Sequence, residues 1–190
     1  MADPTTIVVA TFDEESKTFQ AFSEIKHLAT QRKITLEGLA IVRRTANGGI
    51  ETPEVVTSGQ RGAFAGGLIG SLIGILGGPL GVLLGWGTGA FLGSLRDLNE
   101  VRSDISLIQR LSEGMNPGNV ALMGEVSADS TREVANVVRR LGGEMLQRPA
   151  AEIEEEIRQA NEASEAASNE AKKRFGQGRG SNTPSDEASS

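Results

Sequence analysis

The sequence GAFAGGLIGSLIGILGGPLGVLLGWGTGAFLGSL, residues 62–95, contains no charged side chain, and the rest of the chain is interpreted around it. Glycine recurs there at every fourth position in two series. The first series is Gly62, Gly66, Gly70, Gly74 and Gly78, and the second is Gly81, Gly85, Gly89 and Gly93. Residues four apart share one face of a helix, so each series predicts a groove without side chains along an apolar helix. We therefore expect a helical hairpin of two glycine-zipper arms, packed as small residues pack in lipid.

The length of the arms favours a hairpin that enters a membrane from one side. An arm of about sixteen residues is about 24 Å long at the helical rise, whereas the apolar core of a bilayer is about 30 Å thick. A hairpin that dips into the bilayer fits this length. Its ends are expected at the cytoplasmic interface, where basic and aromatic residues gather. The residues concerned are Arg61, Phe64, Phe91 and Arg96.

A second interpretation places the same helices in a protein-only apolar core of a soluble oligomer. Glycine costs about 1 kcal/mol per residue relative to alanine in a helix, which makes these arms poor helices in water. Lipid enforces the helix despite the glycines, because unsatisfied peptide groups are costly there. The stability of a glycine-rich helix is therefore greater in lipid than in water, which favours the membrane. The protein-only core stays open as the alternative.

The flanking sequence predicts two β-α-β units that share one antiparallel sheet. Strands are expected at residues 5–11, 34–44, 50–57, 119–126 and 144–148, and helices at 14–32 and 130–141. Pro53 confines the third strand to an edge, and Ser130 with Glu133 suggests a capping box. The order is that of a ferredoxin-like split β-α-β sandwich of the α+β class, with the glycine-zipper hairpin inserted between its halves. A single membrane span would place the two halves on opposite sides, so we expect a hairpin, dispensable for the folding of the rest.

The expected organisation has five parts. They are residues 1–61 for the first half with its hairpin strand, 62–95 for the inserted hairpin, 96–149 for a helix and the second half, 150–175 for a charged, alanine-rich helix, and 176–190 for a disordered tail. The C-terminal helix carries small apolar residues at heptad-like spacing, which predicts a weak oligomer seam. The seam residues are Ile153, Ile157, Ala160, Ala167 and Ala171.

Five stretches of the chain resemble a bacterial domain-of-unknown-function family of predicted membrane proteins, some of which are grouped with general-stress proteins. They are IVVATFDEESKTFQAF (7–22), GLAIVRRTANGGIE (38–51), the glycine-rich block, NPGNVALMGEV (116–126) and LGGEMLQ (141–147). The resemblance covers residues 5–148. It implies a membrane-associated stress protein and brings no catalytic residues, and the helix after Pro149 lies outside its pattern.

Composition excludes several classes of function. The 190-residue chain has a net charge of −6 and no basic run, which argues against nucleic-acid binding. It has no cysteine, no tyrosine and one histidine, His27, so disulfides and thiol catalysis are excluded. The acidic run from Glu152 to Glu156 is typical of a solvated helix face rather than a metal site. We expect no enzyme, no metal and no cofactor.

The function expected from these patterns is that of a membrane-associated structural or regulatory module. The hairpin would insert into the lipid bilayer and self-associate, and the α+β domain would lie in the cytoplasm. The C-terminal helix and tail would recruit a protein partner or further copies. Two alternatives remain, a soluble ligand-sensing domain and a small pore. The block offers few polar groups to line a pore: Ser71, Thr88 and Ser94.

Overall fold

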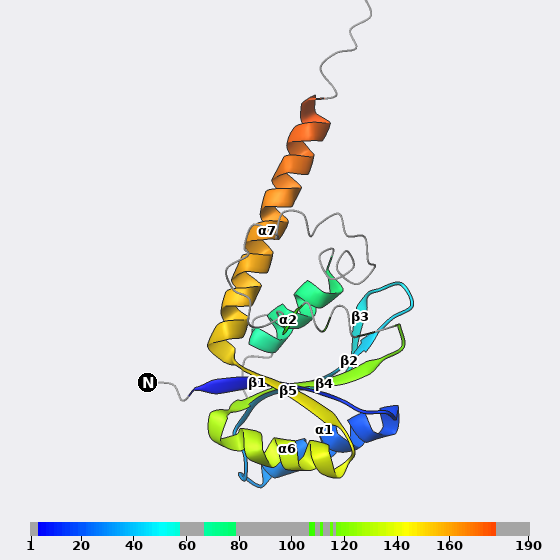
Figure 1. Ribbon diagram of the computed structural model, residues 1–190, viewed down its shortest axis with the longest axis vertical. Coiled ribbons are helices and arrows are strands. Elements are labelled where there is room, and N and C mark those ends of the chain that lie inside the picture. Colours follow the sequence, from blue (N-terminus) through cyan, green and yellow to red (C-terminus); the bar gives the residue numbers. More distant parts are fainter. Residues whose placement is uncertain are drawn as a thin grey trace, which may run out of the picture.

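The computed structural model of the chain describes residues 4–57, 67–78, 107–108, 111, 115 and 117–177, with the backbone alone at 164, 167–168 and 170–177. In these residues the chain forms a five-stranded antiparallel sheet and four α-helices, which confirms the predicted α+β class. Figure 1 shows α1 and α6 on one side of the sheet and α2 and α7 on the other. We call these sides the α1 face and the α2 face.

The elements follow one another along the chain in this order. They are β1 (Thr5–Thr11), α1 (Glu15–Thr30), β2 (Leu36–Arg44), β3 (Ile50–Thr57), α2 (Leu68–Gly77), β4 (Val120–Ser127), the short 3-10 helix η1 (Ala128–Ser130), α6 (Thr131–Arg140), β5 (Glu144–Pro149) and α7 (Ala150–Gln177). The bounds of β1 and β3 agree with those expected from the sequence. The first two residues of the expected tail, 176 and 177, belong to α7, and its other residues, 178–190, lie outside the described residues.

The strands lie in the order β3-β2-β4-β1-β5. Strand β4 separates β1 from β2, and β1 separates β4 from β5, so the units β1-α1-β2 and β4-α6-β5 interleave in one sheet. Both crossover helices then lie on the same face (Figure 1). Among the described strands, β3 pairs with β2 alone, and it is an edge strand of this sheet, as Pro53 predicts.

Both faces of the central strands are covered. In β1, Ile7 and Val9 belong to the apolar cluster under α2 and α7, whereas Val8 and Ala10 belong to the cluster over α1 and α6. Successive side chains of a strand point to opposite faces, so an uninterrupted apolar run is what two covering layers require. The domain therefore has two cores, one on each side of the sheet.

Two adjacent glycines connect α6 to β5 for different reasons. Gly142 has a φ of +78°, which is the left-handed conformation that ends many helices. At Gly143 a Cβ atom would lie 2.5 Å from Cε1 of Phe12 and 2.9 Å from the carbonyl oxygen of Thr11. The start of β5 can approach the end of β1 this closely because no side chain stands between them.

The hydroxyl of Ser130 has a different role from the capping box that the sequence suggests. No side-chain hydrogen bond caps the start of α6. Instead, the backbone N–H of Thr35 donates to Ser130 Oγ at 2.9 Å, and the hydroxyl of Ser127 lies 2.8 Å away. The buried hydroxyl thus joins the entry of β2 to the start of α6, and this long-range bond replaces the predicted local one.

Candidate functional site

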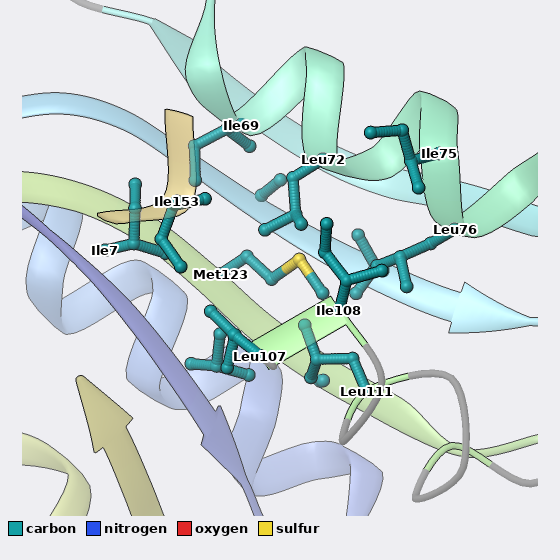
Figure 2. Packing of buried hydrophobic residues seen from close by; sticks show 14 of the residues in the cluster. Ile7, Ile69, Leu72, Ile75, Leu76, Leu107, Ile108, Leu111, Met123 and Ile153 are labelled. Carbon is teal, nitrogen blue, oxygen red and sulfur yellow. The ribbon is translucent and has the colours of Figure 1, made fainter. Parts of the chain in front are cut away.

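Helix α2, the described part of the glycine-rich stretch, is a layer of the domain. Its branched side chains point toward the sheet and surround Met123 of β4 (Figure 2). They are Ile69, Leu72, Ile75 and Leu76, which are between 0% and 7% exposed. The expectation of an arm that stands apart from the sheet is therefore wrong for this helix, because the sheet's second face needs an apolar cover and α2 supplies it.

Two glycines of α2, Gly70 and Gly74, lie on the side of the helix away from its four buried side chains. Gly74 is exposed and Gly70 half-buried, and a Cβ atom built on Gly74 would meet no atom within 4 Å. At Gly78, just past the helix, a Cβ atom would lie 2.9 Å from the carbonyl oxygen of Gly74. The glycine that packs closely is Gly77, where a Cβ atom would lie 3.4 Å from Cβ of Ile50 in β3. Gly77 is outside the four-residue series, so the zipper pattern did not identify it.

Helix α2 is also short. It has ten residues, and no helix in the described parts of the chain is long and apolar enough to cross a membrane. The remaining residues of the two expected arms and their ends lie outside the described residues. The predicted packing glycines among them are Gly62, Gly66, Gly81, Gly85, Gly89 and Gly93, and the predicted interface residues are Arg61, Phe64, Phe91 and Arg96.

The first half of the expected oligomer seam is buried inside one chain. Ile153 is 0% and Ile157 8% exposed, and both belong to the cluster that contains Ile7 and the apolar side chains of α2. Ala160 is partly buried against the same cluster. These three residues thus serve the domain's own core, because α7 folds back over the sheet after β5. Ala167 and Ala171 lie further along α7, and their side chains are not described.

An acidic side chain of α7 makes specific contacts that the sequence did not indicate. The carboxylate of Glu156 accepts hydrogen bonds from the backbone N–H groups of Leu107, at 3.3 Å, and Ile108, at 3.4 Å. Leu107 and Ile108 are themselves buried in the cluster on the α2 face. The acidic run was interpreted as a solvated face, but this one member attaches residues 107–108 to α7.

A second acidic side chain lies half-buried on the α2 face of β4. Thr5 Oγ1 donates to Glu125 Oε1 at 3.0 Å. Burial raises the pKa of the Glu125 carboxyl above its ordinary value; the hydrogen bond from Thr5 opposes this, and the charges of Glu37 and Glu154 add to it. Ionisation of Glu125 is therefore less favourable in the folded state than in the unfolded chain.

Glu125→Gln is expected to stabilise the domain at neutral pH. The raised pKa of Glu125 means that the folded state binds the proton more tightly than the unfolded chain does. The free energy of unfolding therefore falls as the pH rises from the ordinary pKa of a glutamate carboxyl to the raised pKa of Glu125. The urea midpoint of Glu125→Gln should exceed that of wild type at pH 7, and the difference should shrink at pH 3.5, where both states are protonated. A lower midpoint at pH 7 would contradict this assignment.

Glu155→Gln is the matched control. Its hydrogen bond with Arg158 lowers the pKa of Glu155 to about 2, which is the opposite direction. Its ionised form stabilises the folded state above the ordinary pKa of a carboxyl, and that contribution is lost as the pH falls toward 2. The control substitution should slightly lower the urea midpoint at pH 7, because an exposed ion pair contributes little.

A polar groove of about 510 Å³ runs between α1 and α6 on the opposite side of the molecule. It contains His27, whose Nε2 lies 2.7 Å from Nε2 of Gln31, and an ion pair between Arg140 and Glu24. The ion pair joins α6 to α1 across the groove, whereas His27 and Gln31 both lie at the end of α1. His27 is exposed on α1, where the sequence placed it as a helix surface residue.

One family model matches the middle of the chain. The model of a family described as "Protein of unknown function (DUF1269)" matches residues 61–161. Comparison with curated proteins and with solved structures gives no match. The matched range includes α2, β4, α6, β5 and the start of α7, so the pattern extends past Pro149, where the sequence analysis expected it to end. Since the match covers more than half of the chain, this protein belongs to the DUF1269 family of proteins of unknown function.

Proposed function

We propose that this protein is a non-enzymatic, membrane-associated structural or regulatory module that displays a ferredoxin-like α+β domain. The glycine-rich stretch would hold the domain at a bilayer and bring copies together. The interleaved strand order supports the ferredoxin-like assignment. One observation supports the proposed role at a membrane: one side of α2 is buried against the sheet, and the other side is neither charged nor packed on the sheet.

The side of α2 away from the sheet lacks the charges that a water-facing helix surface usually has. The helix reads LIGSLIGILG and contains no charged residue. Four of its branched side chains are buried against the sheet, and Gly70 and Gly74 lie on the other side. A helix that is apolar all round is normally covered on every side. This supports a further apolar partner for α2, either lipid or protein.

The position of α2 changes which residues can enter a membrane. Removing α2 from the sheet would expose the part of the cluster that α2 covers, so we assign the membrane contact to the stretch after it. Residues 81–95 continue without a charge and contain Trp86 and Phe91. Fifteen residues are about 22 Å long as a helix, too short for a bilayer core of about 30 Å. The attachment is therefore an insertion from one side.

Flotation with lipid vesicles tests this proposal. The full chain should float with the vesicles and resist a carbonate wash, and a variant with residues 81–95 replaced by a Gly/Ser linker of equal length should not float. The matched control replaces residues 178–190 in the same way and should float like wild type. A full chain that stays at the bottom of the gradient, or a linker variant that floats equally well, would overturn the proposal.

A protein-only assembly is the second candidate. It is favoured by the burial of the branched side of α2 within the chain itself, as in a protein core. It is also favoured by the acidic surface of α7, which would be repelled by anionic lipid. A chain that fails to float but sediments as an oligomer, and becomes monomeric when residues 81–95 are replaced, would support this candidate.

A further inference from the structure

Strand β5 is an open edge of the sheet. It pairs with β1 on one side, and no strand among the described residues pairs with its other side. An open edge presents backbone N–H and C=O groups that can pair with another strand. Leu146 in the middle of β5 is 38% exposed. Among the described residues, it is one of two large apolar side chains that are classed as exposed. The edge thus combines a strand side with which no other described strand pairs and an exposed apolar side chain.

The side chains of β5 alternate in a way that complements a second β5. Leu146 lies opposite Val9 of β1, on the α2 face, and Glu144 and Arg148 share that face because they are two residues away on either side. If two β5 strands pair antiparallel about Leu146, each Glu144 lies opposite Arg148 of the second copy. Leu146 then lies opposite Leu146. Opposite charges and paired apolar side chains at facing positions stabilise a strand pair.

The other open edge of the sheet, strand β3, does not carry a self-complementary pattern of charges. Strand β3 contains two acidic residues, Glu51 and Glu54, and no basic one, and Pro53 interrupts its backbone donors. Two copies of β3 would place like charges near each other. Its exposed apolar residue, Val55 at 41%, therefore lies on an edge that disfavours self-pairing.

We propose that β5 is a self-pairing edge, at which two copies of this chain join their sheets antiparallel about Leu146. A two-fold axis perpendicular to the sheet keeps both α2 faces on the same side. The two sheets then continue into one, with the α2 and α7 layers of both copies side by side on it. This contact uses a different surface from the proposed membrane attachment and does not depend on it.

The contact is small, so the dimer is expected to be weak. Strand β5 has six residues. Stable dimers usually bury about 800 Å² on each partner, and a strand pair of this length buries less. Local concentration would then decide how much of it forms, and attachment of the chains to one surface would raise that concentration.

Site-specific cross-linking tests the register directly, because the chain has no cysteine of its own. In the full chain, Leu146→Cys should form a disulfide with its counterpart at least about tenfold faster than Val55→Cys, the matched control on β3. Facing residues of an antiparallel pair lie at the Cα separation that a disulfide needs. Equal rates for the two cysteines would overturn the proposal, whatever other assembly the chain makes.

Charge exchange separates this register from other contacts between β5 strands. In the Leu146→Cys background, Glu144→Arg or Arg148→Glu alone should slow cross-linking about tenfold, because each places like charges opposite one another twice. The double variant Glu144→Arg/Arg148→Glu should restore the rate. Circular dichroism confirms that each variant is folded. Failure of the double variant to recover, with both single variants folded and slow, would rule out the proposed register.

Discussion

Replacing residues 62–95 by a short Gly/Ser linker is expected to abolish cooperative folding of the whole domain. The replacement removes α2, and with it four side chains buried against the sheet: Ile69, Leu72, Ile75 and Leu76. Each such burial contributes about 2 kcal/mol, so the loss is on the order of 8 kcal/mol. That is comparable to the whole stability of an ordinary domain, about 5–15 kcal/mol. Circular dichroism during urea unfolding should show no cooperative transition.

The linker replacement of residues 81–95 alone is the control, because it keeps α2 on the sheet. That variant should unfold cooperatively. The sequence pattern alone predicts the opposite outcome for replacement of residues 62–95, because it indicates that the whole stretch is an insertion. A variant lacking residues 62–95 that unfolds with a wild-type midpoint would show that α2 is dispensable for the domain.

The strands were predictable because their signals are local. The β-branched run from Thr5 to Thr11 coincides with β1, and Pro53 identifies β3 as an edge strand. The two β-α-β units follow from the order of these local patterns, and α1 and α6 follow from the spacing of their apolar residues. Each of these conclusions depends on neighbouring residues, so the sequence alone sufficed for the sheet and one of its two covering layers.

The second covering layer was missed because an apolar helix does not identify its own partner. The stretch around α2 has the same composition whether it faces lipid or a sheet. A signal was nevertheless present in the strands. In β1 and β2 the apolar residues do not alternate with polar ones, as in Ile7–Ala10 and Leu39–Val42, so both faces needed a cover. Two predicted helices covered one face, and the glycine-rich stretch, the helix expected before the second half and the C-terminal helix were left for the other.

The C-terminal helix was misinterpreted for a related reason. Ile153 and Ile157 stand one turn apart, which fits the seam of a coiled coil and also fits a helix laid on a sheet. The difference lies further along, because no large apolar residue follows Ile157 until Phe175 and the spacing continues with alanines. A helix with its two isoleucines in the first turns fits a core contact near its start. Glu156 could not be identified at all, since its partners are backbone groups distant in the sequence.

Leu72→Ala and Gly74→Ala are expected to change stability in opposite directions. Leu72 is 0% exposed and faces the sheet, so its truncation should cost about 3 kcal/mol, within the usual range for a buried leucine. Gly74 is exposed within the same helix, and a Cβ atom there meets nothing within 4 Å. Alanine should therefore stabilise α2 by up to about 1 kcal/mol through its higher helix propensity. Urea unfolding of the two variants measures both effects.

This pair of substitutions decides which side of α2 the protein uses for folding. If the glycine side were the packed side, as in a zipper closed within the chain, a Cβ atom on Gly74 would separate the packed backbones and destabilise the fold. Leu72→Ala would then be the milder change. The structure predicts the reverse order, so Gly74→Ala leaves the fold intact and acts only on whatever covers the glycine side. A variant that is more stable in urea yet no longer assembles or floats would therefore assign the glycines to a contact outside the domain.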